Sequence, residues 1–439
     1  MHKLRITMSL LVLAVLLLSG CMLTVDEMYQ LPKRSDAYND LQSAIDKAMS
    51  DLSYCAPLTG ENQQTVQMVD LDGDGQQEYL LFAKSTEERP LRILVFRKVG
   101  DVFENINTVQ CNGSAFDQVE YVDMDGNGGM EVVVGKQLSD QVIRSLSVYT
   151  FTDGELVQLA SVNYHKFLTA DLDGDNLSEL FVLRPGSVDT DNGLAELYRM
   201  KNGTLERSNE VSMSQPADKL KRIVVGKLDG GVTAVYVASA VGDNALITDV
   251  YAMVDDMLKN VSFSNESGTS VQTMRNYYVY ADDIDHDSVV ELPSLITMKP
   301  LDEMQPTDTH HLIRWYAMSQ DGDEVDKMYT YHNFVGGWYL RLPDEWASRV
   351  VARNIGPQYD FYLWDEAYKD TKKLLSVFVY TGQNREQQGS ADGKFVLHKT
   401  DSTIYAASLE EIASNYGITQ ESVTQSFQLI QQDWKTGET

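Results

Sequence analysis

Apolar residues near the start of the chain follow the spacing of one helical face. Between residues 35 and 53 they recur every three or four positions, at Tyr38, Leu41, Ile45, Met49 and Leu52. Such spacing is typical of an amphipathic helix that packs on one side. Ser35 stands before the first of them and is a suitable N-terminal cap. We therefore expect a helix over residues 35–53.

Further along, the apolar residues gather in short continuous runs. Runs of this length, rich in branched and aromatic side chains, are typical of buried strands. They occupy residues 79–82, 93–96, 132–134 and 146–151. Gly next to Asp or Asn marks tight turns between them, for example at residues 152–154 and 201–203. The pattern predicts many short strands joined by turns.

A segment rich in Asp and Gly returns five times within this strand region. Its copies begin at residues 70, 123, 171, 227 and 283, so the steps are 53, 48, 56 and 56 residues. A unit of about 50 residues with about four short strands is typical of a propeller blade. We expect a mainly β chain. It comprises a β-propeller of about five visible blades over residues 54–332, preceded by the short helix and followed by a small α+β domain over residues 333–439.

The repeated loops carry oxygen-bearing side chains at fixed positions. In the first loop they stand at positions 1, 3, 5 and 9, with glycines between them that let the backbone turn tightly. Such a set suits Ca²⁺, which binds six to eight oxygens and tolerates irregular geometry. The predicted ligands are Asp70, Asp72, Asp74, the Gln76 carbonyl and Glu78, then Asp123, Asp125, Asn127 and Glu131, then Asp171, Asp173, Asp175 and Glu179, and finally Asp283, Asp285, Asp287 and Glu291.

Two other kinds of loop share part of this pattern. An EF-hand requires a glutamate at position 12, where the four loops have Leu81, Val134, Val182 and Ser294. Loops without metal would be ordinary tight turns. The fourth copy has Lys227, Gly231 and Val235 in place of ligands, so we expect no metal there. Lys227 either places its ammonium near Asp229 or reflects degeneration of the repeat.

The repeats resemble the FG-GAP or VCBS repeats of integrin alpha-subunit propellers and of many bacterial surface proteins. The resemblance covers roughly residues 54 to 330 and implies blades around an axis with calcium loops between strands. The integrin propeller has seven blades, whereas five loops are visible here. Either this chain forms five blades, or further blades lack the loop.

The last hundred residues differ in pattern. Residues 337–346 (GWYLRLPDEW) resemble the opening of PsbP-like domains. Strands are expected at 361–364, 374–380, 395–398 and 404–407. Ser408 with Glu411 forms a capping-box pattern, and a second helix is expected to carry Val423, Phe427, Ile430 and Trp434 on one face.

The first 21 residues have the layout of an export signal. Lys3 and Arg5 precede an apolar run from Met8 to Leu18, and Leu18-Ser19-Gly20-Cys21 follows. This tetrapeptide resembles the lipobox of bacterial lipoproteins, whose cysteine receives diacylglycerol. The resemblance implies a signal peptide over residues 1–20, lipidation of Cys21 and a tether over residues 21–34. We expect the protein on the extracytoplasmic face of the cell membrane, with membrane lipid as one partner.

The formal net charge of −29 argues against nucleic acid or an anionic lipid surface as a partner. After lipidation two cysteines remain, Cys55 and Cys111. Export permits a disulfide between them, and two buried free thiols are the alternative.

No catalytic motif is found: the chain has neither Gly-x-Ser-x-Gly nor His-Glu-x-x-His. We therefore predict a calcium-binding module for an extracellular protein or glycan ligand. The alternative is an enzyme that acts on extracellular polysaccharide. Aromatic side chains that either stack on sugars or belong to the core are Trp315, Tyr316, Trp338 and Trp364.

Overall fold

The computed structural model describes residues 36–138, 144–186, 191–301, 310–391 and 393–430. Within these ranges the chain forms six antiparallel sheets, most of them simple meanders. The first sheet contains β1 (Ser53–Tyr54), β2 (Val66–Val69), β3 (Glu78–Lys84), β4 (Leu91–Val99) and β5 (Val102–Cys111). The second contains β6 (Ala115–Val122), β7 (Glu131–Gln137), β8 (Arg144–Thr152) and β9 (Glu155–Tyr164). The expectation of a mainly β chain is confirmed.

The remaining sheets continue the same order. The third holds β10 (Lys166–Ala170), β11 (Glu179–Arg184), β12 (Leu194–Lys201) and β13 (Thr204–Ser212), and the fourth holds β14 (Leu220–Lys227), β15 (Thr233–Val241), β16 (Ala245–Val254) and β17 (Met257–Asn260). The fifth holds β18 (Glu291–Thr297), β19 (His311–Met318), β20 (Glu324–Asn333), β21 (Trp338–Leu342) and β27 (Phe427–Leu429). The sixth holds β22 (Val350–Ile355), β23 (Gln358–Trp364), β24 (Thr371–Thr381), β25 (Phe395–Lys399) and β26 (Thr403–Leu409).

The sheets stack face to face because their central strands are apolar on both sides. Val132 and Val134 of β7 pack against the first sheet, whereas Val133 between them packs against the third. This follows from the alternation of side chains along a strand. The continuous apolar runs of the sequence are therefore strands that lie between two neighbouring sheets.

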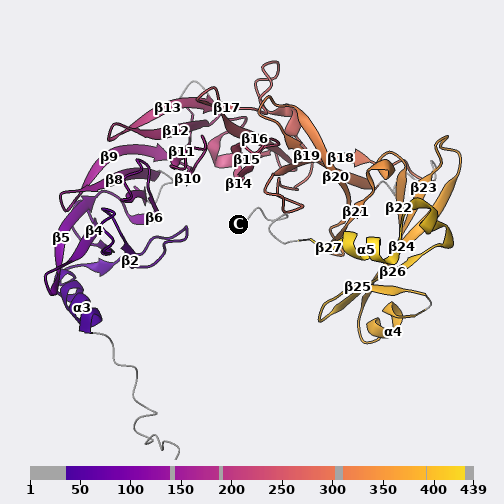
Figure 1. The fold of residues 1–439 in the computed structure, drawn as a ribbon, viewed down its shortest axis with the longest axis horizontal. Helices are drawn as coiled ribbons and strands as arrows, with labels where there is room; N and C mark the ends of the chain where they lie inside the picture. The colour runs from indigo at the N-terminus through magenta and orange to yellow at the C-terminus, as the bar shows by residue number, and fades with distance from the viewer. Residues whose placement is uncertain (1–35, 139–143, 187–190, 302–309, 392, 431–439) are drawn as a thin grey trace, which may run out of the picture.

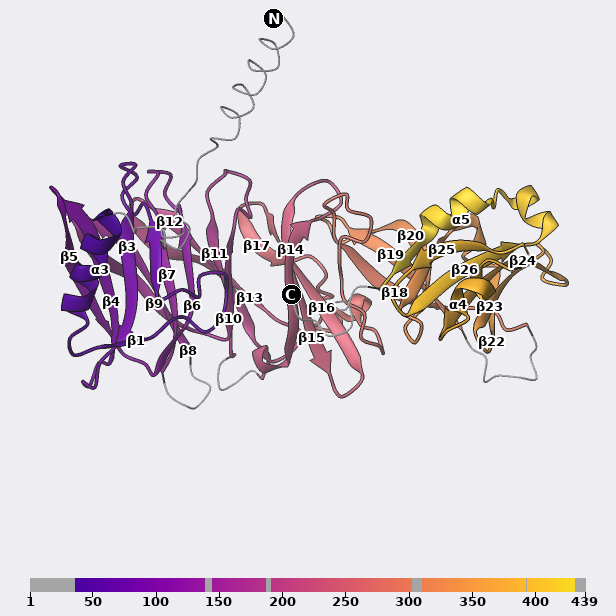
Figure 2. The same ribbon diagram turned by 90° about the horizontal axis from the view of Figure 1, so that it is seen from below.

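The stack forms an open arc (Figure 1), with the first strands of successive sheets, such as β6, β10 and β14, on the concave side. Figure 2 shows the same sheets side by side along the length of the molecule. Helix α3 (Asp36–Ala48) covers the free face of the first sheet, where Ile45 packs against Leu81, Ala83 and Phe96. The expected closed ring is therefore not seen, because a helix occupies the face that a last blade would have to meet.

The sixth sheet accounts for the difference between five predicted blades and six observed sheets. It has no Asp/Gly loop, so the repeat pattern did not reveal it. The four strands expected after residue 360 all lie within it. β20 runs across the expected boundary at residues 332 and 333, and one apolar core joins Leu312 of the fifth sheet to Phe361 of the sixth.

The prediction of a C-terminal helix with Val423, Phe427, Ile430 and Trp434 on one face is wrong. Helix α5 (Gln420–Ser426) ends before Phe427, which begins β27 and pairs with Leu340 of β21. Residues 411–416 form a 3₁₀ helix instead of the capped helix expected there, and α4 (Arg385–Gly389) was not foreseen. Trp434 lies outside the described residues.

Cys55 and Cys111 are free thiols, and the Cys111 sulfur lies 3.4 Å from the Tyr149 hydroxyl. The signal, Cys21 and the tether fall outside the described residues. Among the residues that are described, no helix is long and apolar enough to span a membrane.

Candidate metal centres

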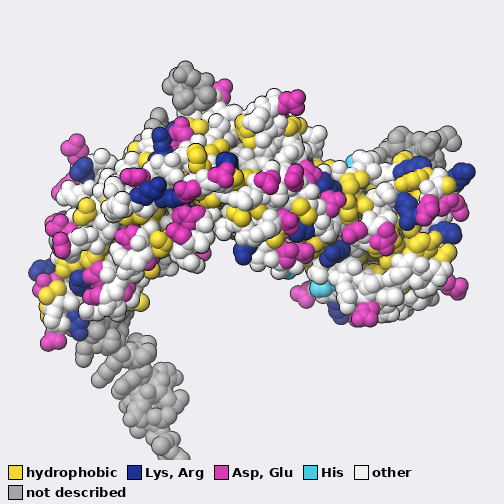
Figure 3. Space-filling view, turned by 45° about the horizontal axis from the view of Figure 1, so that its top comes forward, with side chains coloured by type: hydrophobic (Ala, Val, Ile, Leu, Met, Phe, Trp, Pro, Cys, Tyr) yellow, Lys and Arg dark blue, Asp and Glu magenta, His cyan; other side chains and the backbone are white. Residues whose placement is uncertain are grey.

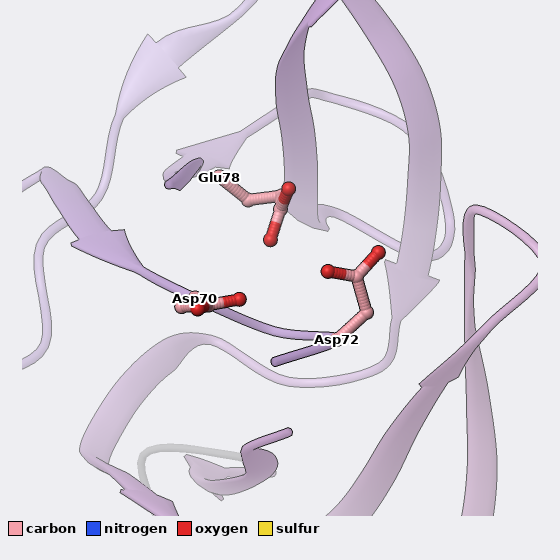
Figure 4. A group of neighbouring side chains, drawn as sticks. All are labelled: Asp70, Asp72 and Glu78. Carbon is pink, nitrogen blue, oxygen red and sulfur yellow. The ribbon is translucent and has the colours of Figure 1, made fainter. Parts of the chain in front are cut away.

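Four of the five repeated loops bring three carboxylates together. Figure 4 shows the first of these groups, in which the side chains of Asp70, Asp72 and Glu78 point toward one another. In each group one oxygen from every side chain lies within 4.8 Å of the others. The groups are Asp70, Asp72 and Glu78; Asp123, Asp125 and Glu131; Asp171, Asp173 and Glu179; and Asp283, Asp285 and Glu291. Positions 1, 3 and 9 of each loop thus meet, as the sequence spacing predicts.

The glutamate of each group fixes the loop with one carboxylate oxygen, while the second oxygen meets different neighbours. This second oxygen accepts from Arg97 in Glu78 and from Thr150 in Glu131, and it has no hydrogen-bond partner in Glu291 among the described residues. Glu78 Oε2 accepts a hydrogen bond of 2.8 Å from the Leu71 backbone N–H. The same bond recurs in the other three loops, from Met124, Leu172 and Ile284. Each glutamate is the first residue of its strand and is buried. The strand therefore places one carboxylate beneath the loop in all four sheets.

Residues at position 5 support the loop from within. Asp74 Oδ1 accepts from the Gln76 N–H at 2.7 Å, and Asp175 Oδ1 accepts from Leu177 at 2.8 Å. Asn127 and Asp287 do the same for Gly129 and Val289. These four side chains are not among the close carboxylate groups, and coordination by them or by the Gln76 carbonyl stays a prediction.

The fifth loop keeps this shape without glycine. His286 and Ser288 have φ values of 63° and 73°, which match the left-handed turns of Gly73 and Gly75 at 71° and 85°. Non-glycine residues adopt such angles rarely and at some cost. The loop geometry is therefore retained even where the glycine signal of the sequence is absent.

The donor set fits a divalent cation on two grounds. The Asp70 Oδ1 and Glu291 Oε1 atoms are buried and have no hydrogen-bond partner among the described residues. Burial raises the pKa of Glu291 to about 8, and the negative charges of Asp285, Asp287 and Asp283 add to this rise. The hydrogen bond from the Ile284 N–H lowers the pKa and offsets only part of the rise. Burial likewise raises the pKa of Glu179 to about 7. Hard oxygens that repel one another in this way suit Ca²⁺.

A guanidinium occupies part of the first group. Arg97 of β4 donates through Nε to Glu78 Oε1 at 2.7 Å and also forms an ion pair with Asp72. In the third group, Arg199 approaches Asp173 at 3.5 Å but is bound more closely to Asp256 at 2.6 Å. Sequence reasoning missed both arginines because they lie about twenty residues beyond the loop. The pairing of the strand that begins with the glutamate with the next strand places each arginine beside that glutamate. A prediction of this strand pairing could have identified both arginines.

The fourth loop is not among the carboxylate groups of the described residues. Asp229 pairs with Lys327 of β20 at 2.8 Å. The cation beside Asp229 is therefore contributed by the next sheet. Of the two alternatives for Lys227, the one in which its ammonium pairs with Asp229 is not seen among the described residues.

Most of the aromatic residues considered for sugar stacking belong to the core. Trp315, Tyr316 and Trp338 are buried, and Trp364 is half-buried beneath the Lys299 ammonium.

On the surface, Asp and Glu side chains are spread along the whole visible length of the arc (Figure 3). A cleft of about 410 Å³ opens beside the fifth loop, where its lining includes Asp285, His286 and Arg341.

No profile of a known protein family matches the chain, and no curated protein matches its sequence significantly. Among solved structures it is similar to a protein from Lactobacillus plantarum, with 13% identity, 73% of this chain and 86% of that chain covered, and a TM-score of 0.28. It is also similar to a rhamnogalacturonan lyase from Bacillus licheniformis, with 13% identity, 73% and 72% coverage, and a TM-score of 0.29. An exotype rhamnogalacturonan lyase matches with 14% identity, 74% and 69% coverage, and a TM-score of 0.27. Similarity at this level carries no argument about activity or substrate.

Proposed function

We propose that the protein is a lipid-anchored, extracytoplasmic array of β-sheets that binds Ca²⁺ and holds a protein or glycan ligand. The observation that carries this proposal is the recurrence of one carboxylate group at the same register of four sheets. A catalytic pair is seldom copied once per sheet, whereas a stabilising cation site often is. Each bound ion would join the loop before a strand to the first residue of that strand.

Calcium would stabilise the array through ordinary linkage. An ion that binds only the folded state stabilises it by RT ln(1 + [L]/Kd), about 1.4 kcal/mol per site at ten times the dissociation constant. Titration calorimetry on the exported chain, with thermal unfolding in chelator and in calcium, tests this directly. Heat of binding and a higher melting temperature in calcium are expected. Absence of both would identify the loops as ordinary turns.

The anchor rests on the resemblance of Leu18-Ser19-Gly20-Cys21 to a lipobox. Two acyl chains on Cys21 would hold the protein stably at the membrane. The FG-GAP or VCBS-type character of the repeats is likewise part of this proposal, and so is the PsbP-like character of the C-terminal region.

The cleft beside the fifth loop is the place we propose for the ligand. Its exposed Arg341 and the side chains of Gln425 and Gln428 offer hydrogen-bond donors next to Asp285. Screening protein and glycan ligands with and without calcium, and repeating the screen with Arg341→Ala, tests this assignment. Incubation with cell-surface polysaccharides tests the alternative, because turnover of any of them would show an enzyme.

A further inference from the structure

One position on the strand next to the buried glutamate differs between the sheets that carry a carboxylate group. Continuing the register of the paired strands, the residue opposite the glutamate is Arg97, Thr150, Arg199 and Ala317 in the first, second, third and fifth sheets. The four carboxylate groups are alike in their loops. They differ in what the neighbouring strand presents to them.

In the first sheet this position supplies a permanent positive charge. Arg97 contacts both Asp72 and Glu78, which are two of the three side chains that a metal would need. The third, Asp70, keeps a buried Oδ1 without a hydrogen-bond partner among the described residues. Its guanidinium also lies 5.2 Å from the centre of the Phe151 ring of the second sheet. An arginine does not lose its proton in a protein. A divalent ion would therefore have to displace a held cation or bind against its repulsion.

In the fifth sheet the same position offers nothing polar. Ala317 stands opposite Glu291, whose side chain is fully buried and whose Oε1 has no partner in the described part of the chain. The ammonium of Lys327 is held by Asp229 at 2.8 Å. The same ammonium is also attracted by Asp287 and Glu291 of the fifth loop, although its ion pair is with Asp229. Among the described residues, the fifth group therefore has an unsatisfied buried oxygen and no ion pair to its three clustered carboxylates.

The other two sheets lie between these extremes. Thr150 donates a neutral hydrogen bond of 3.1 Å to Glu131 Oε1, which leaves the charge of the second group unbalanced. Arg199 is divided, because Asp256 holds it at 2.6 Å while Asp173 lies at 3.5 Å.

We propose that Arg97 takes the place of the divalent cation in the first loop, and that the fifth loop is a site where Ca²⁺ is needed. This inference rests on the proposed calcium function and divides the four groups that the sequence treats as equivalent. The first loop is thus held together by a charge within the protein itself and does not depend on the calcium supply.

Counting bound ions tests the division. Equilibrium dialysis with radioactive calcium on the full exported chain gives the number of ions per chain. Asp285→Asn should lose one ion, while the matched Asp72→Asn should lose none. Arg97→Met, which keeps an apolar stem over Phe151, should gain one ion, and adding Asp72→Asn to it should remove that ion again.

The outcomes separate this inference from the proposed function. Loss of an ion in Asp72→Asn alone, or an unchanged count in folded Arg97→Met, would overturn the role of Arg97 while calcium binding stands. An unchanged count in Asp285→Asn would overturn the fifth site. If no form of the protein retained calcium, the proposed function itself would fail. Should Arg97→Met not fold, the comparison of the two asparagine variants still decides.

Discussion

Replacing Glu291 by Gln should change stability in opposite directions with and without calcium. The glutamine carbonyl can still accept the hydrogen bond that Ile284 N–H donates at 3.1 Å to Glu291. The substitution therefore removes a charge and keeps the shape of the loop. Because the Glu291 side chain is fully buried, that charge must be either neutralised by a proton or balanced by a cation.

The magnitude follows from the pKa of Glu291, which burial raises from 4.5 to about 8 when no cation is bound. At pH 7 the chelated protein holds a proton that the unfolded chain would release. The difference of about 2.5 units between pH 7 and the unfolded pKa corresponds to between about 3 and 4 kcal/mol, at about 1.4 kcal/mol per unit. Water near the loop reduces this figure, so Glu291→Gln should stabilise the chelated protein by about 2 kcal/mol.

The pH dependence has a definite sign. A folded-state pKa above the unfolded value gives stability that is fully present below about pH 4.5 and is lost as pH rises through about 8. Chelated wild-type protein should therefore lose stability between pH 5 and pH 8. The glutamine side chain of the variant does not titrate, so the slope of the variant should be smaller over the same window.

With calcium at one hundred times the dissociation constant, one site contributes about 2.7 kcal/mol. Glu291→Gln weakens that site and should then be the less stable protein. Urea unfolding at pH 5.5 and 7.5, in chelator and in calcium, measures both signs, and Glu206→Gln on an exposed strand is the control. Equal destabilisation of the Glu291 variant in all four conditions would refute the reasoning.

Three further predictions concern other parts of the chain. Cys21→Ser should leave the protein in the soluble fraction or unprocessed, and unchanged membrane partition would contradict the anchor. Asp249→Ala should cost about 3–5 kcal/mol in urea unfolding, because this buried carboxylate accepts from the Ser214 N–H at 2.8 Å and from Ser270 Oγ at 2.6 Å. Asp249→Asn should cost less, because the amide oxygen can still accept one of these bonds. Equal losses in the two variants would contradict this and show that the amide does not replace the carboxylate. A fragment of residues 36–212 should keep the β circular dichroism of its three sheets, since stacked repeats depend on their neighbours alone; an unfolded fragment would show that the later sheets are required.

The local spacing of residues was sufficient to predict the carboxylate loops and the strands that follow them. The spacing of Asp70, Asp72 and Glu78 is short-range information, and a loop that leads into a strand converts it directly into proximity. The same holds for helix α3, whose apolar face is legible in sequence. Features of this kind depend on residues fewer than ten positions apart.

Other features depend on pairings that the sequence does not encode locally. Arg97 reaches Glu78 only through the register of β3 and β4, and Lys327 reaches Asp229 from another sheet. Helix α5 ends before Phe427 because the residues that follow pair as β27 with β21, although the local spacing of apolar residues predicts a longer helix. The open arc follows from where α3 docks, and amphipathicity alone does not specify a docking face.

Helix α3 has a consequence for how such a chain can vary over evolutionary time. In a closed ring the angle between neighbours fixes how many blades complete the circle, so a gained or lost blade strains every interface. Here the first sheet ends against a helix, and no strand of the described chain links the first sheet to the sixth. Duplication or deletion of a whole unit of about 50 residues would change the length of the arc and leave each remaining contact as it was. Related chains could therefore differ by whole sheets while sharing the same terminal helix.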